Sequence, residues 1–262
     1  MATSDPPNMT NSAELQAQLN RLFGSFKAEW LRDDIFELFI EPTYFPDLTT
    51  ARPCVLEGGR GTGKTTALRG LSYQGQAALA AKSGHAISKR PYIGLYYRIN
   101  TNHVTAFSGP ELTEDQWCRH FAHYVNLLLV DLILEYLDWA RMQNQIGTIP
   151  TGALWQDVAT ALNFHSAQTY QELRQVLSEA IIKFEAYINN VRDGQRPQLS
   201  LQSKPIDLLT ERLVTLSEFQ GKQFFFLVDE YENLLDYQQR VFNTLIKQAT
   251  PAYTFKVGVR EL

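Results

Sequence analysis

Four short apolar runs along the chain predict β-strands: Cys54–Leu56, Tyr92–Ile99, Phe224–Val228 and Phe255–Val259. The run Phe224–Val228 is apolar throughout, as expected of a strand that is buried on both faces of a sheet. Helical patterns separate the runs from one another. The alternation predicts an α/β fold in which a parallel sheet lies between helices.

Apolar residues spaced three and four positions apart predict the helices. Near the N-terminus, a capping box at Asn11 and Glu14 opens one helix, and a second helix covers Phe26–Ile40. Prolines then interrupt the pattern, so Glu41–Pro53 is expected to be a connector. The first ten residues are polar and are expected to be disordered.

The middle of the chain, about residues 101–220, is dominated by helical patterns. A capping box at Thr113–Gln116 opens a long apolar helix, and a second capping box at Thr169–Glu172 opens another. The segment Asp193–Lys204 is a polar loop, and Pro205 is expected to start a further helix. This stretch predicts a large helical insertion between the second and third strands.

The composition narrows the class of protein. The net charge is −4 at pH 7, with Lys and Arg dispersed, whereas nucleic-acid surfaces need concentrated positive charge. The composition therefore argues against nucleic acid as a partner of this segment, without excluding a local basic patch. The two cysteines lack metal-type spacing, and neither a signal peptide nor a stretch of membrane-spanning length is present. We therefore expect a soluble protein of the reducing cytoplasm.

The segment from Gly58 to Thr65 fits the P-loop pattern, in which a glycine, four further residues and Gly-Lys-Ser/Thr join a strand to a helix. Glycines let backbone N–H groups approach phosphates closely, and the helix N-terminus adds positive charge. Lys64 is expected to reach the β- and γ-phosphates, and the Thr65 hydroxyl to ligate Mg²⁺. The helix is expected to continue into Gln76–Lys82. The predicted nucleotide-binding residues are Gly58, Gly59, Arg60, Gly61, Thr62, Gly63, Lys64, Thr65 and Thr66.

An acidic pair follows the most apolar strand. Asp229 and Glu230 come directly after Phe224–Val228, which is the Walker B pattern. Asp229 is expected to hold Mg²⁺ through water, and Glu230 to polarise the attacking water as general base. An apolar strand with an acidic exit also occurs by chance, but its pairing with an upstream P-loop favours the functional interpretation.

Three further features of the sequence each have two possible roles, one at the nucleotide and one elsewhere. Arg260, at the end of Phe255–Val259, is expected either to contact the γ-phosphate or to be solvated. Arg240 and Lys247, on a helix predicted after Asp229, could act on a neighbouring copy's nucleotide, although a solvated helix face is favoured. Tyr44–Pro46 either contacts the adenine or covers the core. The predicted catalytic residues are Lys64, Glu230 and Arg260.

Together, the stretch Glu57–Thr66, the pair Asp229–Glu230 and Arg260 resemble an AAA+-type ATPase. The closest resemblance is to the bacterial origin-recognition-complex-like AAA ATPases, with the STAND signal-transduction ATPases as near neighbours. It covers roughly Tyr44–Ile99 and Phe224–Arg260. The resemblance implies ATP and Mg²⁺ as ligands and a sheet of the additional-catalytic-Glu type, with strand order 5-1-4-3-2 and the fifth strand absent.

The chain departs from that family pattern in two places. The helical insertion at about residues 101–220 replaces a short excursion, and the fifth strand and lid domain would follow Leu262. We therefore expect either a fragment or a protein without its lid, with residues 1–45 as N-terminal tail and helices and residues 46–262 as the ATPase core. The strand Cys54–Leu56 would then be an exposed sheet edge, which predicts self-association.

Two functions compete at this point. The first is ATP hydrolysis that drives remodelling of an unidentified protein partner, and Glu230 favours it. The second is a nucleotide-gated switch or binding module with little or no turnover, which the missing lid favours. A third function, loading of a factor onto DNA, is suggested by the resemblance alone, and the charge balance argues against it. The sequence leaves the question of enzymatic turnover open.

Overall fold

The computed structural model describes residues 36, 39–83, 90–147, 149, 152–192 and 195–261. The chain divides into two compact units, Met1–Ile40 and Glu41–Leu262, and the fold below is that of the second unit. The helix predicted near Asn11 and most of the helix predicted over Phe26–Ile40 lie outside the described residues.

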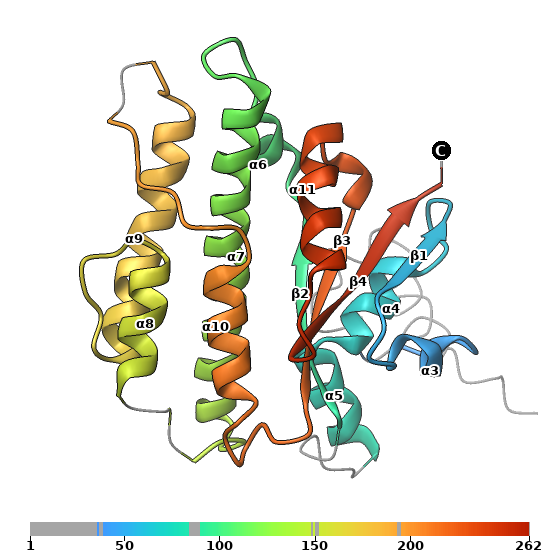
Figure 1. The fold of residues 1–262 in the computed structure, drawn as a ribbon. Coiled ribbons are helices and arrows are strands. Elements are labelled where there is room, and N and C mark those ends of the chain that lie inside the picture. The colour runs from blue at the N-terminus through green and yellow to red at the C-terminus, as the bar shows by residue number, and fades with distance from the viewer. Residues whose placement is uncertain are drawn as a thin grey trace, which may run out of the picture. The chain divides into compact units, whose positions relative to one another are not determined.

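The helices and strands follow one another in the alternating order that the sequence predicts (Figure 1). In chain order they are α3 (Phe45–Leu48), β1 (Cys54–Gly58), α4 (Lys64–Leu71), α5 (Tyr73–Ser83), β2 (Tyr92–Arg98), α6 (Thr101–Thr105), α7 (Glu114–Met142), α8 (Ala153–Ala161), α9 (Tyr170–Ile188), α10 (Lys204–Leu213), β3 (Gln223–Asp229), the 3₁₀ helix η2 (Tyr231–Asn233), α11 (Asp236–Lys247) and β4 (Tyr253–Arg260).

The strands form one parallel four-stranded sheet in the order β1-β4-β3-β2. β4 lies in the middle, with Val257 opposite Val55 of β1 on one side and opposite Val228 of β3 on the other. β2 pairs with β3 on the far side, where Arg98 lies opposite Asp229. The predicted α/β fold with a parallel sheet is confirmed, and these four strands have the predicted order.

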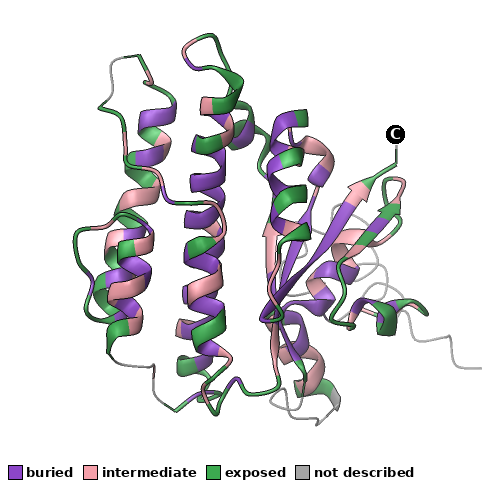
Figure 2. Cartoon of the chain, in the orientation of Figure 1, coloured by how far each residue is buried: buried purple, intermediate pink, exposed green. Residues whose placement is uncertain are grey.

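Strand β3 forms the centre of the core. Each residue from Phe224 to Val228 is at most 1% exposed, and Figure 2 shows the middle of the sheet as buried. Phe225 stacks on Tyr92 of β2, with ring centroids 4.6 Å apart and nearly parallel planes. β1 contrasts with it, because this strand lies at the edge of the sheet and its Val55 is 64% exposed.

Helices cover both faces of the sheet (Figure 1). α4 packs against all four strands on one face, while α7 packs against β2 on the other and carries α11 beside it. Gly94 of β2 permits the close approach of α4, since a Cβ there would lie 2.1 Å from the carbonyl oxygen of Leu71. The single helix predicted from Thr65 into Gln76–Lys82 is two helices. The break occurs at Ser72, whose hydroxyl accepts a hydrogen bond from Gly75 N and so caps α5.

The predicted capping boxes differ in how completely they form. At the start of α7, Thr113 Oγ1 accepts from Gln116 N at 3.3 Å, and Gln116 Oε1 accepts from Thr113 N at 2.9 Å. At the start of α9, Thr169 Oγ1 accepts from Glu172 N at 3.2 Å. The Glu172 carboxylate, however, accepts from Gln168 N at 2.7 Å, one residue before the cap. The first box is complete, and the second is only half of one.

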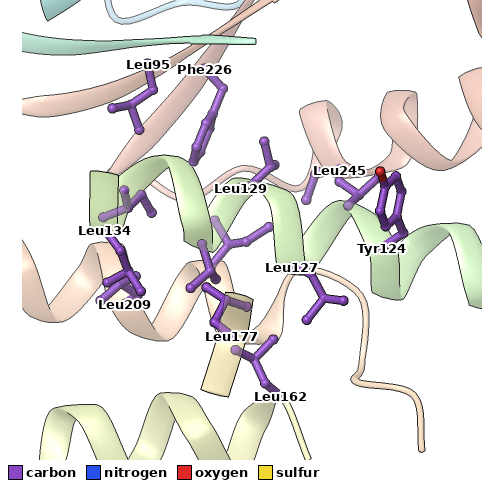
Figure 3. Packing of buried hydrophobic residues seen from close by; sticks show 14 of the residues in the cluster. Leu95, Tyr124, Leu127, Leu129, Leu134, Leu162, Leu177, Leu209, Phe226 and Leu245 are labelled. Carbon is purple, nitrogen blue, oxygen red and sulfur yellow. The ribbon is translucent and has the colours of Figure 1, made fainter. Parts of the chain in front are cut away.

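Helix α7 joins the sheet to the rest of the helical insertion. Figure 3 shows Leu129 directed toward Phe226 of the sheet, and Leu127 directed away from it toward Leu177 of α9. The helix is apolar around most of its circumference because it packs against the sheet, α9, α10 and α11. None of the helices in the described parts of the chain combines the length and apolar character needed to cross a membrane.

Two side chains of α11 hold the segment around α6 against that helix. The Gln238 amide donates to the carbonyl oxygen of Val104 at 2.7 Å. The Tyr237 hydroxyl donates to the carbonyl oxygen of Phe107. Both donors are buried, so these hydrogen bonds are shielded from water. The segment that follows β2 is thereby fixed to the helix that follows β3.

The connector Glu41–Pro53 is more ordered than its prolines predicted, since it contains α3. A fully buried lysine of β4, Lys256, attaches it to the sheet by donating to the carbonyl oxygens of Thr50 at 2.6 Å and Arg52 at 2.5 Å. Its ammonium also lies 4.7 Å from the centroid of the Phe225 ring. Burial lowers the pKa of Lys256 to about 8, against the two carbonyl contacts that favour the charged form.

Candidate functional site

The predicted site residues come together at the carboxyl ends of the strands, because parallel strands all end on the same side of the sheet. Gly58, the last residue of β1, lies opposite Arg260, the last residue of β4. The backbone N–H of Glu261 donates to the carbonyl oxygen of Gly58 at 3.2 Å, which holds the two strand ends together. Asp229 ends the next strand, β3.

The loop between β1 and α4 has two glycines with positive φ. Gly61 and Gly63 have φ values of 81° and 86°, a region in which residues with side chains are strained. A Cβ on Gly58 would lie 2.9 Å from the Thr62 hydroxyl oxygen, which itself donates to the carbonyl oxygen of Gly59 at 2.9 Å. The loop is therefore compact, its backbone favours glycine at Gly61 and Gly63, and a side chain at Gly58 would displace that of Thr62.

Lys64 begins α4 and folds back over the loop. Its ammonium donates to the carbonyl oxygens of Gly58 at 2.5 Å and Gly59 at 2.9 Å. Thr65 and Thr66 follow in the first turn of the same helix, where backbone N–H groups have no acceptor within the helix. The loop thus combines a cation, two hydroxyl groups and a helix N-terminus, which is the set that binds phosphate.

The Asp229 carboxylate is buried, with an exposed fraction of 2% for the residue. Its Oδ2 accepts from the Tyr96 hydroxyl of β2 at 2.9 Å, and its Oδ1 accepts from the backbone N–H of Glu230 at 3.0 Å. Burial and the adjacent carboxylate raise the pKa of Tyr96, so the phenol stays protonated and donates. Gly258 of β4 leaves room for this carboxylate, since a Cβ there would lie 2.9 Å from Asp229 Oδ1.

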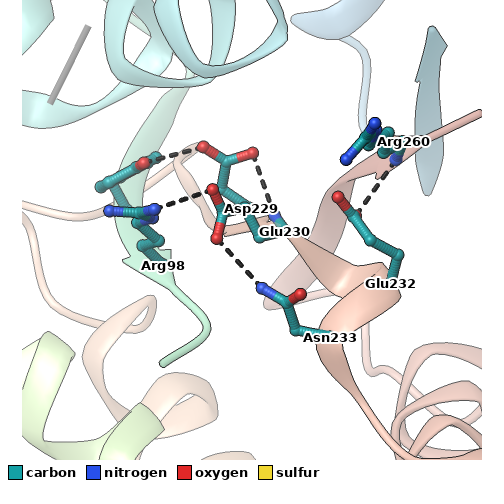
Figure 4. A network of polar contacts seen from close by, with 7 residues as sticks. Arg98, Asp229, Glu230, Glu232, Asn233 and Arg260 are labelled. Carbon is teal, nitrogen blue, oxygen red and sulfur yellow. Dashed lines mark hydrogen bonds and ion pairs between the residues drawn. The ribbon is translucent and has the colours of Figure 1, made fainter. Parts of the chain in front are cut away.

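Glu230 has a left-handed backbone conformation, with φ 58° and ψ 42°, which is uncommon for a residue other than glycine. Both oxygens of its carboxylate accept hydrogen bonds (Figure 4). Oε1 pairs with the Arg98 guanidinium at 2.8 Å, and Oε2 accepts from the Asn233 amide at 3.0 Å. The predicted general base is therefore held by the end of β2 on one side and by η2 on the other.

A family model described as ORC-CDC6-like matches residues 21–262. The chain belongs to the ORC-CDC6-like family. This confirms the resemblance to origin-recognition-complex-like ATPases and identifies an AAA+-type nucleotide-binding domain. No curated protein and no solved structure matches the chain.

In this ORC-CDC6-like chain, Arg260, Arg240 and Tyr44, each of which had both a nucleotide role and a structural or solvated role in prospect, lie in different surroundings. Arg260 is exposed, and its backbone N–H donates to Glu232 Oε2 at 3.1 Å (Figure 4). Arg240 forms an exposed ion pair with Glu114 of α7, which occupies its guanidinium within the same chain. Tyr44 is 41% exposed. These surroundings leave both interpretations of Arg260 and Tyr44 open.

The residues of the site fit the ligands that the ORC-CDC6-like family implies. Mg²⁺ prefers hard oxygen donors, and the Thr65 hydroxyl and Asp229 carboxylate are of this type. They come from elements in contact, because α4 packs against β3 and β4. The glycine conformations of the loop fit a phosphate group.

Five residues of this site were not predicted from the sequence. They contact the acidic pair or the strand ends from other strands and from η2, and they are Tyr96, Arg98, Glu232, Asn233 and Gly258. A signal existed for Arg98, because it is a polar residue at the end of a predicted parallel strand. Gly258, within an apolar strand, was a second signal, since such a glycine marks close approach of another group.

Proposed function

We propose that this chain binds ATP together with Mg²⁺ and hydrolyses it, and that the cycle drives or gates a protein partner. The observation that carries the proposal is that the P-loop, the acidic pair Asp229–Glu230 and Arg260 meet at the carboxyl ends of neighbouring strands. A module that only binds nucleotide needs no second carboxylate beside the metal ligand, so Glu230 supports hydrolysis.

Lys64 and the loop backbone are proposed to bind the triphosphate. The ammonium now donates to two neutral carbonyl oxygens, those of Gly58 and Gly59. Phosphate oxygens would replace them, because their negative charge attracts the ammonium more strongly than neutral carbonyl oxygens do. Arg60, Thr62 and Thr66 complete the proposed phosphate site.

Thr65 and Asp229 are proposed to hold Mg²⁺. When bound, the ion neutralises negative charge on the β- and γ-phosphates. Asp229 is suited to this role because its position is fixed before any ligand arrives, by Tyr96 on one oxygen and by a backbone N–H on the other. A preorganised ligand avoids the cost of ordering the side chain on binding.

Glu230 is proposed to accept the proton of the attacking water. Each of its oxygens accepts one hydrogen bond, and the two donors hold the carboxylate in place, so we propose that one of them releases it before it turns toward the attacking water. Arg98 is the donor on the surface side, with a side chain that is 41% exposed. Arg260, at the neighbouring strand end, is proposed to contact the γ-phosphate.

The pair between Arg98 and Glu230 also favours a second candidate function. If this pair persists when nucleotide is bound, the Glu230 carboxylate stays turned toward Arg98, and the chain is a nucleotide-gated switch with little turnover. The two functions share the nucleotide site and differ in whether the Glu230 carboxylate stays paired with Arg98. Turnover measurements therefore separate them, and nucleotide binding alone does not.

The position and exposure of strand β1 bear on how the chain associates with partners. The edge position of β1 and the exposed Val55 support self-association through this strand. The protein partner is unidentified. The net charge of −4 makes nucleic acid an unfavourable partner for this segment.

Calorimetric titration of ATP in Mg²⁺ tests the nucleotide site through Lys64→Ala. Loss of a charge-assisted hydrogen bond should cost about 1.5–3 kcal/mol, which lowers ATP affinity by roughly 10- to 150-fold. Lys183→Ala is the control, because Lys183 is an exposed lysine of α9 with no part in the proposed site, and the variant should bind ATP like the parent. Equal affinities of two folded variants would remove Lys64 from the site, and a parent that binds no ATP would reject the proposed function.

A further inference from the structure

The Asp229 carboxylate is constrained from two neighbouring strands. Tyr96, on β2, donates to Oδ2 at 2.9 Å, although in the strand register it lies opposite Leu227, two residues before Asp229. On the β4 side, Gly258 lies so close that a Cβ would come within 2.9 Å of Oδ1. Rotation of the carboxylate in either direction would break the first contact or tighten the second.

The contact with Tyr96 bridges a large separation in sequence. The two residues are 133 positions apart, and the phenol is the side chain that donates to Asp229 within the described part of the chain. A carboxylate oxygen has two lone pairs, so a hydrogen bond to Oδ2 leaves acceptor capacity free. The hydroxyl thus sets the direction of the carboxylate without using up its ability to bind a further partner.

We propose that Tyr96 is a positioning residue for Mg²⁺, which fixes the Asp229 carboxylate in the orientation that the metal requires. The inference rests on the proposed function, because it assigns a role toward the same metal. Groups that hydrogen-bond a metal-ligating carboxylate orient it, and their loss lowers metal affinity about 10- to 100-fold. Tyr96 acts through Asp229 and contacts neither phosphate nor metal in this scheme.

Tyr96→Phe tests the assignment, because it removes the hydroxyl and keeps the ring. ATP is titrated by calorimetry into the full chain, first in EDTA and then over a series of MgCl₂ concentrations. We expect ATP affinity in EDTA to equal that of the parent. The Mg²⁺ concentration that gives half of the metal-dependent gain in affinity should rise about 10- to 100-fold.

Tyr92→Phe is a matched control. Tyr92 belongs to the same strand and, four residues earlier, to the same face. It is 4% exposed, and its hydroxyl has no hydrogen-bond partner among the described residues. This variant therefore loses a buried tyrosine hydroxyl without touching Asp229, and it should keep the Mg²⁺ dependence of the parent.

A second variant approaches the carboxylate from the other side. Gly258→Ala places a methyl group against Asp229 Oδ1 and should raise the Mg²⁺ requirement in the same way as Tyr96→Phe. Denaturant unfolding without nucleotide measures the stability of each variant. It separates a shift in metal affinity from a general loss of structure.

The outcomes distinguish this inference from the proposed function. If the parent depends on Mg²⁺ and Tyr96→Phe has the same half-saturation as Tyr92→Phe, the positioning role is wrong and the proposed function stands. If Tyr96→Phe weakens ATP binding equally in EDTA and in Mg²⁺, its role is structural, and the inference is again overturned. A parent whose ATP binding ignores Mg²⁺ would overturn both.

Discussion

The ion pair between Arg98 and Glu230 gives a direct test of whether the general base is restrained. Arg98→Gln removes the charge that holds Oε1 and keeps part of the side-chain stem. The Asn233 amide still donates to Oε2, so Glu230 loses one of its two partners. A carboxylate that is held at one oxygen only is freer to turn toward a water molecule. We therefore expect the variant to turn over ATP faster than the parent.

The expected size follows from the exposure of the pair. The side chains of Arg98 and Glu230 are 41% and 30% exposed, and ion pairs with this access to water contribute about 0.2–1 kcal/mol. The free energy of unfolding should fall by that amount. If the same free energy no longer opposes release of the carboxylate, turnover should rise about 1.5- to 5-fold.

Single-turnover hydrolysis, stopped by acid quench with the protein in excess over ATP, measures this step without interference from product release. Arg119→Gln is the control, because Arg119 pairs with Asp115 at 2.8 Å and both side chains are more than 70% exposed. The control should hydrolyse ATP at the parental rate. If Arg98→Gln is no faster than the control, the pair does not restrain Glu230. If it is slower, Arg98 contributes to the reaction itself.

Two further predictions concern the base and the buried lysine. Glu230→Gln should keep Mg²⁺-ATP affinity and lower single-turnover hydrolysis about 10²- to 10⁴-fold; unchanged hydrolysis would show that Glu230 is not the base. Because burial lowers the pKa of Lys256 from 10.5 to about 8, the unfolded chain binds more protons between these pH values, and the free energy of unfolding should rise with pH across that window. Denaturant unfolding of Lys256→Met should lack this rise; parallel pH profiles for both proteins would contradict it.

The sequence predicted the features that depend on neighbouring positions. The P-loop, the acidic pair and the four strands are local patterns of residue type and spacing, and the strand order followed from the family resemblance. The break at Ser72 was missed because a serine that caps α5 resembles a serine inside a helix until its hydrogen bond with Gly75 is known. The half-formed cap at Thr169 was missed for a similar reason, since the spacing to Glu172 does not determine which backbone N–H donates to the carboxylate.

The residues that hold the acidic pair could not be predicted from local patterns. Arg98 and Glu230 are 132 positions apart, and their contact depends on the pairing of β2 with β3 across the whole helical insertion. Gly258 depends on the register of β4 against β3. The buried Lys256 was equally hidden, because the carbonyl acceptors that satisfy it belong to Thr50 and Arg52, before the first strand.

The attachment of α6 to α11 has a consequence for how this region can vary or be redesigned. Tyr237 and Gln238 donate to peptide carbonyls, which every amino acid possesses, so substitutions at Val104 and Phe107 leave the acceptors in place. Those two positions need only remain apolar, since both are buried. The exposed stretch 101–103 is free of even that requirement. A new recognition sequence could therefore be grafted there, provided that the donors Tyr237 and Gln238 of α11 are left unchanged.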